Sequence, residues 1–247
     1  EGLCKVVLKD DRTAAVVEVN SETDFVAKNE VFQSYVARVA AQVLASNNTT
    51  MEAFMAEPWI DDASFTVEQE LSQMVAKIGE NLSIRRFAKV EEDGVVYVGY
   101  THGGGRIGVI VGIKTDAAAD EIAAVGKDVA MQVAAANPGY LNETEVPAEV
   151  LEKEKEILKV QAINEGKPEA IAEKMVQGRI KKFYKENCLM DQEFIKDGDQ
   201  TIKSYTEAKA KELGGKIEIL SFVRYEKGEG IEKKEEDFAA EVAAQLK

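Results

Sequence analysis

The side chains able to carry out covalent chemistry are few in this sequence of 247 residues. His102 is the single histidine, so neither a histidine pair nor a metal site made of several histidines can form within the chain. Cys4 and Cys188 are the two cysteines, and their spacing fits reduced thiols of a cytoplasmic protein rather than metal ligands. The G-x-S-x-G, Walker A and H-E-x-x-H motifs are absent. We therefore predict no catalytic residue, no metal site, no cofactor and no enzymatic activity.

One ten-residue segment, NSETDFVAKN, combines charge, helix-capping residues and an aromatic side chain. Ser21 and Asp24 have the spacing of a helix capping box. Phe25 lies seven residues before Phe32, so in one unbroken helix the two rings would share a buried face. Asn29 is a second candidate cap, and a helix that restarts there would leave Phe25 on a separate exposed turn. An exposed phenylalanine contributes little to folding but can anchor a protein interface, and the residues leave the two interpretations nearly balanced.

The composition is that of a globular protein with a strongly acidic balance. Hydrophobic residues make up 45% of the chain, which is enough for a core in a protein of this length. The formal net charge of −14 argues against broad nucleic-acid binding, because such binding needs a surface that neutralises phosphates. No apolar run approaches the roughly 18 residues that a membrane-spanning helix needs. We expect a protein partner, with no membrane and no direct nucleic-acid contact.

A pattern of two strands, two helices and a further strand occurs twice along the chain. The residues match as well: VVEVNSETD resembles VIVGIKTD, and the closing strand IRRFAKVE resembles ILSFVRYE. We therefore predict an α+β fold with a duplicated strand-strand-helix-helix-strand core. The expected elements of the first copy are strands at 3–8, 13–19 and 82–90 and helices around 32–43 and 67–78. Those of the second copy are strands at 95–101, 106–113 and 216–226 and helices around 120–137 and 202–215.

The second copy is longer than the first, and residues 147–187 fill the difference. Pro147 suits the first turn of a helix, the sequence GKP suits a turn, and apolar residues recur at helical spacing on both sides of it. This pattern predicts an inserted antiparallel helical hairpin. Its basic run RIKKFYK contains Arg179, Lys181 and Lys182, which could contact RNA, although lysines near the end of a helix also complement its dipole.

Two glycines, in the sequence GEG, precede the last residues of the chain. The spacing of the apolar residues after them predicts an amphipathic helix with Phe238 and Val242 on its apolar face. The predicted division is a first core subdomain at 1–93, a second core subdomain at 94–146 and 188–230, a coiled-coil hairpin insertion at 147–187 and a C-terminal helical module at 231–247.

Five segments, in this order, resemble the elongation factor Ts family, the guanine-nucleotide exchange factors of bacterial translation: EVNSETDFVAKN, VAKIGENLSIRR, HGGGRIGVIV, GKPEAIAEKMVQGRIKKF and GEGIEKKEEDFAAEVAAQ. The resemblance covers essentially the whole chain. It implies a two-part α+β core, a coiled-coil insertion in the second part and a C-terminal helical module, in agreement with the pattern above. It also leads us to expect that the small three-helix N-terminal domain of the family is missing from this sequence.

The resemblance further implies that the protein binds elongation factor Tu in the cytoplasm and promotes GDP release. Asp24 and Phe25 match the pair that intrudes into the partner's G domain and disturbs its Mg²⁺ and phosphate site. The second half of the core is expected to hold the partner's outer β-barrel domain, and a 2:2 complex is compatible with the family. The implied contact residues are Thr23, Asp24, Phe25, Val26, Ile78, Gly79, His102, Phe238 and Val242.

Two other functions remain open on the residues alone. A small-molecule enzyme would use a polar groove between the duplicated halves. A scaffold or RNA-assembly protein would act through the basic helical hairpin. The sequence GGGR at 103–106 resembles a phosphate cradle, but its place between two strands favours a hairpin turn. Neither alternative accounts for the five matching segments.

Overall fold

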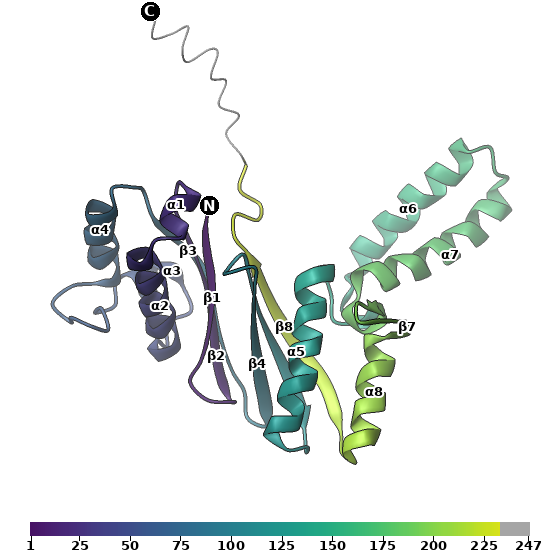
Figure 1. Cartoon of the computed structure of the whole chain (residues 1–247). Helices are drawn as coiled ribbons and strands as arrows, with labels where there is room; N and C mark the ends of the chain where they lie inside the picture. The colour runs from purple at the N-terminus through teal and green to yellow at the C-terminus, as the bar shows by residue number, and fades with distance from the viewer. Residues whose placement is uncertain (233–247) are drawn as a thin grey trace, which may run out of the picture.

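Two three-stranded antiparallel sheets form the centre of the molecule in the computed structural model, which describes residues 1–232 apart from the side chain of Ala119 (Figure 1). This combination of helices and antiparallel sheets is an α+β fold, as predicted. The first sheet has the order β1 (Gly2–Leu8), β2 (Thr13–Asn20), β3 (Ser83–Glu91). The second has the order β4 (Val95–His102), β5 (Ile107–Thr115), β8 (Ile217–Glu226).

The two sheets pack against each other through one face of each. Alternation along the strands supplies both faces, because successive side chains of a strand point to opposite sides. In β2, Ala14 and Val16 point towards the second sheet, whereas Ala15 and Val17 point towards the helices. The layer between the sheets is closed by buried residues of both: Ala14, Val16, Val95, Tyr97 and Ile110.

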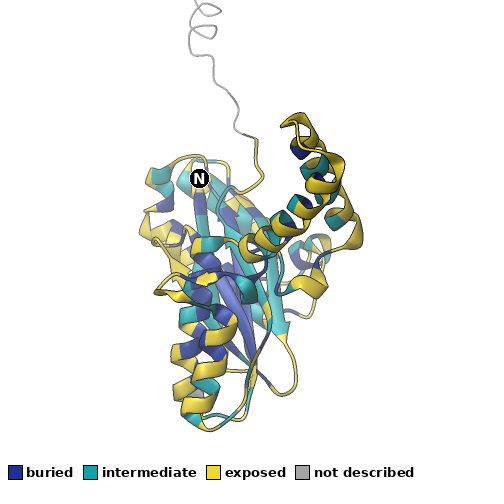
Figure 2. Ribbon diagram, turned by 90° about the vertical axis from the view of Figure 1, so that its right-hand side faces the viewer, coloured by how far each residue is buried: buried dark blue, intermediate teal, exposed yellow. Residues whose placement is uncertain are grey.

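The outer face of the first sheet is covered by helices α2 (Glu30–Ala45) and α4 (Val67–Ile78). Phe32, Val36 and Val39 recur at helical spacing on α2 and are buried against the sheet. A short helix, α3 (Met51–Met55), adds the fully buried Phe54 to the same cluster. Figure 2 views the opposite side of the molecule, where the helices that cover the second sheet show the same division into a buried side and an exposed side.

The outer face of the second sheet is covered by α5 (Ala119–Ala136) and α8 (Ile202–Leu213). Between them the chain forms a helical hairpin that projects away from the sheets (Figure 1). None of the helices in the described part of the chain is long and apolar enough to cross a membrane. The elements of this long connection are η1 (Glu143–Glu145), α6 (Ala148–Asn164), α7 (Glu169–Asn187), η2 (Leu189–Asp191), β6 (Glu193–Phe194) and β7 (Asp197–Thr201).

Most predicted strands and helices begin and end within two residues of the observed ones. The helix predicted at 32–43 is longer in the structure, and Pro147 is the cap before α6 rather than a residue of its first turn. Helix α3 and the β6–β7 hairpin were not predicted. The predicted C-terminal helix with Phe238 and Val242 falls on residues 233–247, which lie outside the described residues.

Helices α4 and α8 begin and end in the same way. Thr66 caps α4 and Thr201 caps α8, each with a reciprocal capping box. Both helices have twelve residues and end at a glycine with positive φ, 83° at Gly79 and 68° at Gly214. A left-handed residue at this position lets the chain leave the helix sharply, and glycine adopts it without the steric penalty of a side chain.

A glycine inside α5 gives the first testable prediction. A Cβ at Gly126 would lie 2.5 Å from Val98 Cγ2 and 3.0 Å from Ile113 Cδ1. We expect Gly126→Ala to lower the free energy of unfolding by about 1 kcal/mol, because the overlap costs about 1–3 kcal/mol and the gain in helix propensity returns at most about 1 kcal/mol. Urea denaturation measures the change.

The matched control lies in another helix. Gly178 is in the interior of α7, and a Cβ there would meet nothing within 4 Å. Gly178→Ala is therefore expected to raise the free energy of unfolding by about 0.4–1 kcal/mol. A gain in stability for Gly126→Ala as well would contradict the close helix-to-sheet contact.

Candidate functional site

The segment after β2 forms a single helical turn, α1 (Asp24–Ala27), and not the start of a longer helix. Its cap is Thr23, whose Oγ1 accepts a hydrogen bond from the Val26 amide at 3.3 Å. The prediction that Ser21 caps the helix is wrong. Ser21 is buried, and its hydroxyl donates to the Thr23 carbonyl oxygen instead. The helical turn thus begins two residues further from the strand than the sequence pattern indicated.

A second helix starts directly after this turn. Asn29, the second candidate cap of the sequence, caps α2 by accepting a hydrogen bond from the Val31 amide at 2.8 Å. The restart separates Phe25 from the buried stripe that begins at Phe32. The side chain of Phe25 is 81% exposed, whereas Phe32 is fully buried. Of the two interpretations left open by the sequence, the structure therefore supports the exposed one.

The charge beside Phe25 is held by a local ion pair. Lys28 Nζ donates to Asp24 Oδ2 at 2.6 Å, one helical turn apart. The hydrogen bond from Lys28 lowers the pKa of Asp24 below its usual range. The carboxylate is accordingly ionised at neutral pH and lies next to an exposed ring.

The turn is also held from a distant part of the chain. Glu80, which follows Gly79 at the end of α4, accepts hydrogen bonds from the amides of Glu22 and Thr23 at 3.1 Å and 3.0 Å and from the Thr23 hydroxyl. These bonds bring the predicted contact residues Ile78 and Gly79 next to α1. The role of Glu80 was not predicted, because a contact across more than fifty residues leaves no local pattern in the sequence.

His102 lies at the same end of the two sheets. It is exposed at the end of β4, and its Nδ1 is 2.9 Å from the Tyr100 hydroxyl. The glycines at 103–105 form the hairpin turn between β4 and β5, as expected. The carbonyl oxygen of Gly105 accepts from the Cys4 amide at 2.7 Å, which ties this turn to β1 beside the end of β2 (Figure 1). The structure thus brings Thr23–Val26, Ile78–Gly79 and His102 to one end of the molecule.

The buried carboxylate of Glu18 connects several segments of the chain near this end of the molecule. Glu18 in β2 is fully buried and accepts from Arg85 Nη1 at 3.1 Å, from Arg86 Nε at 2.5 Å and from the Gly228 amide at 2.7 Å. Burial acts to raise the pKa of Glu18, but these hydrogen bonds, with one from Asn20, outweigh it and lower the pKa. The carboxylate joins β2 and β3 to the residues that follow β8.

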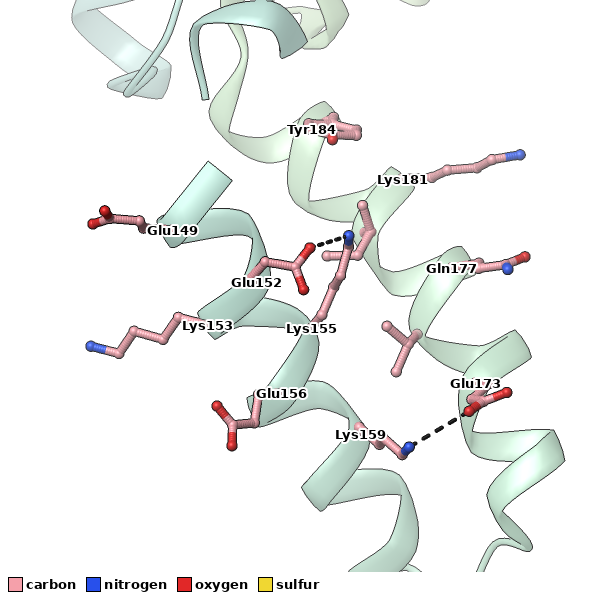
Figure 3. Close-up of a pocket in the computed structure, with 12 residues that line it drawn as sticks. Glu149, Glu152, Lys153, Lys155, Glu156, Lys159, Glu173, Gln177, Lys181 and Tyr184 are labelled. Atoms are coloured by element: carbon pink, nitrogen blue, oxygen red, sulfur yellow. Dashed lines mark hydrogen bonds and ion pairs between the residues drawn. The ribbon is translucent and has the colours of Figure 1, made fainter. Parts of the chain in front are cut away.

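Some of the basic side chains of the helical hairpin are paired with acidic ones. Lys159 bonds Glu169 at 2.9 Å, and Arg179, from the basic run, lies 3.4 Å from Glu165. A groove of about 1160 Å³ runs along α6 and α7, and its lining mixes acidic and basic side chains (Figure 3). Lys182 also has a partner, Glu186 at 3.5 Å. Internal pairing of this kind lowers the charge that the hairpin can offer to RNA phosphates.

The two thiols are unsuited to nucleophilic chemistry. Cys4 and Cys188 are free and buried. Burial raises the pKa of the Cys4 thiol to about 12 and that of Cys188 to about 11. Neither is therefore a thiolate at neutral pH, and the thiolate is the reactive form.

Comparison with known proteins identifies the family. The family model described as Elongation factor TS matches residues 22–229. The chain belongs to the elongation factor Ts family. Elongation factor Ts of Clostridium kluyveri is 51% identical over 247 residues, which are 100% of this chain and 81% of that protein. Elongation factor Ts of Clostridium botulinum (strain 657 / Type Ba4) is 49% identical, with 100% of this chain and 80% of that protein covered.

Membership of the elongation factor Ts family agrees with the five sequence segments that resemble it. It makes the chain a translation elongation factor, acting in protein biosynthesis through guanine-nucleotide exchange. The family match also begins at residue 22, at the start of the turn that carries Phe25.

Proposed function

We propose that the protein binds elongation factor Tu and accelerates its release of GDP. The observation that carries the proposal is the 81% exposure of Phe25 on a turn that is held at both ends. Thr23 caps the turn from one side, and Asn29 starts a new helix on the other. An exposed ring on an ordered turn loses little conformational freedom on binding, which favours a role as an interface anchor.

Exchange requires a difference in affinity between two states of the partner. A ligand that binds the GDP-bound and nucleotide-free forms equally shifts nothing, however tightly it binds. We propose that the Phe25 ring enters a space between helices of the G domain that opens only when GDP leaves. The preference is reciprocal, so the protein weakens GDP binding by the same factor by which GDP weakens its own binding.

The residues around Phe25 have complementary proposed roles. Asp24 is ionised and close to the ring, so insertion would bring a carboxylate towards the Mg²⁺ and phosphate site of the partner. Thr23 and Val26 shape the turn. Ile78, Gly79 and His102, at the same end of the molecule, are proposed as further contacts with the G domain. Phe238 and Val242 are proposed to contact it from the C-terminal module.

We also propose that the two halves of the core are copies of one unit. The capping boxes at Thr66 and Thr201 and the glycine ends at Gly79 and Gly214 support this. The proposed division is a first core subdomain at 1–93, a second core subdomain at 94–146 and 188–230, the helical hairpin at 147–187 and the C-terminal module at 231–247. In this proposal the second half holds the outer β-barrel domain of elongation factor Tu, a 2:2 complex can form, and the protein acts in the cytoplasm.

The alternative of a small-molecule enzyme needs a groove between the two halves. The space between the sheets is filled by side chains, which leaves little room for an active-site groove there.

The proposed function is tested by measuring GDP release. A fluorescent GDP analogue is bound to elongation factor Tu and chased with excess GDP, with and without this protein. Release is expected to be faster with the protein, and the affinity for GDP is expected to fall about 5–150-fold, the factor that corresponds to typical coupling free energies between two sites. The affinity of the protein for nucleotide-free and GDP-bound elongation factor Tu is measured in parallel.

Linkage provides the internal control. The ratio of those two affinities must equal the ratio of GDP affinities with and without the protein. Equal affinity for both forms, together with an unchanged release rate, would overturn the proposal. In that case a salt-sensitive complex with RNA, lost on neutralising Arg179, Lys181 and Lys182, would favour the scaffold function.

A further inference from the structure

Glu80 connects two segments that the chain separates by more than fifty residues. Its Oε2 accepts hydrogen bonds from the Glu22 and Thr23 amides, and its Oε1 accepts from the Thr23 hydroxyl. The Thr23 oxygen in turn accepts from the Val26 amide. One carboxylate therefore supports the backbone before α1 and also the cap of α1, which is the turn that carries Phe25.

The hydrophobic core supports this turn only in part, because Val26 packs against it and is half-buried. Helix α1 has four residues, of which only Ala27 is buried. A single turn of helix has almost no stability of its own, because nucleation fixes several dihedral angles for one hydrogen bond. The hydrogen bond from the Thr23 hydroxyl also lowers the pKa of Glu80, so the carboxylate stays ionised and remains an acceptor at neutral pH. The position of α1 thus depends on the hydrogen bonds of Glu80 as well as on the packing of Val26 and Ala27.

In the second half of the core, the end of β5 meets the end of α8 where the first half has the end of β2 beside the end of α4, but the hydrogen-bonding carboxylate comes from the opposite segment. There the carboxylate is on the strand side: Asp116 Oδ1 accepts from the Lys216 amide at 2.5 Å. The residue after the terminal glycine of the helix is Gly215, where the first half has Glu80. A Cβ at Gly215 would lie 2.5 Å from Asp116 Oδ1. The residue after Asp116 is Ala117, so this junction carries no ring.

We infer that Glu80 is the positioning residue for Phe25, holding the turn at 22–26 in the orientation that presents the ring to the partner. This inference rests on the proposed function. Without Glu80 the turn would have to become ordered when the complex forms. The ordering cost then falls on binding and on exchange, while the two sheets and their helices keep their packing.

The inference predicts a specific loss in the Glu80→Ala variant. GDP release from elongation factor Tu at a subsaturating concentration of the variant is expected to be slower than with wild type by roughly tenfold, the factor expected for losing a hydrogen bond to a charged group. Glu80→Gln keeps one acceptor oxygen and is expected to fall between the two. Asp116→Ala, which breaks the matching junction in the other half, is the control and is expected to exchange like wild type.

A double-mutant cycle separates positioning from general damage. If Glu80 acts only through the ring, Glu80→Ala has no further effect in a Phe25→Ala background. Amide hydrogen exchange of the free protein gives a second measurement. The amides of Glu22 and Thr23 are expected to exchange roughly tenfold faster in Glu80→Ala and to be unchanged in Asp116→Ala.

The outcomes distinguish this inference from the proposed function. Slower GDP release for Phe25→Ala together with wild-type release for Glu80→Ala would overturn the inference alone. Additive losses in the double variant would do the same, because they would show that Glu80 acts independently of the ring. Wild-type release for Phe25→Ala would overturn the proposed role of the ring itself.

Discussion

Replacement of Phe25 by alanine is expected to reduce the acceleration of GDP release about 30-fold or more, which corresponds to the 2 kcal/mol or more of an aromatic interface anchor. The reason is that the ring is 81% exposed in the free protein, so the change removes contacts that form only in the complex. Release of a fluorescent GDP analogue is measured at concentrations that give equal amounts of complex.

The same exposure predicts that folding is unaffected. The free energy of unfolding of Phe25→Ala is expected to stay within about 0.5 kcal/mol of wild type, as for other substitutions at exposed positions. Phe65→Ala removes another exposed phenylalanine, one in the loop before α4, and is the matched control for release. A large loss of stability in Phe25→Ala, or an equal loss of release in Phe65→Ala, would contradict the anchor.

The second large effect is expected at Glu18. Glu18→Gln keeps the size of the side chain but removes its charge, and its new amide donors face the donors of Arg85 and Arg86. Breaking a buried ion pair by removing one partner costs about 3–5 kcal/mol. The arginine side chains are 26% and 29% exposed, so water reaches them in part and we expect a loss near the lower end, about 3 kcal/mol.

Urea denaturation at pH 7 measures this loss. The control is Glu212→Gln, which breaks an exposed pair with Lys209 on α8 and is expected to change stability by less than about 0.5 kcal/mol. Arg86 additionally stacks on Tyr225, 4.3 Å from the ring centre. A change at Glu18 no larger than the control would mean that this cluster contributes specificity rather than stability.

The pH dependence of stability has a definite sign. Because the pKa of Glu18 is lowered in the folded protein, its carboxylate stabilises the fold fully above the unfolded value of about 4.3. That contribution is lost as the pH falls below this value and through the folded pKa. Wild type is therefore expected to lose more stability than Glu18→Gln on acidification across this range.

Elements with a strong apolar period could be predicted from the sequence. The helix of Val67 to Ile78 packs its apolar face on the first sheet, and the strands around Val16 and Val109, whose residues are mostly apolar, are buried on both faces. The capping boxes at Thr66 and Thr201 are local as well, since each joins residues three apart, but they were not predicted. The structure adds the fact that the two sheets meet face to face, which depends on contacts between distant strands.

The details of the candidate site could not be predicted in the same way. Ser21 and Thr23 are both good caps, and the choice between them depends on the burial of Ser21. The two-residue strand β6 and the five-residue helix α3 are too short for a period to be recognised. Nothing in the sequence distinguishes Glu80 from the many other carboxylates, and only the fold brings it next to Thr23.

The exposed ring of Phe25 also bears on how the protein behaves at high concentration. An exposed aromatic side chain is a point at which identical molecules can adhere. Here the ring lies among the carboxylates of Glu22, Asp24 and Glu80, on a chain whose formal net charge is −14. Two copies that approach through this end repel each other, and salt weakens the repulsion because the screening length is only about 8 Å at physiological ionic strength. This repulsion opposes self-association through Phe25 and keeps the ring available to a different protein.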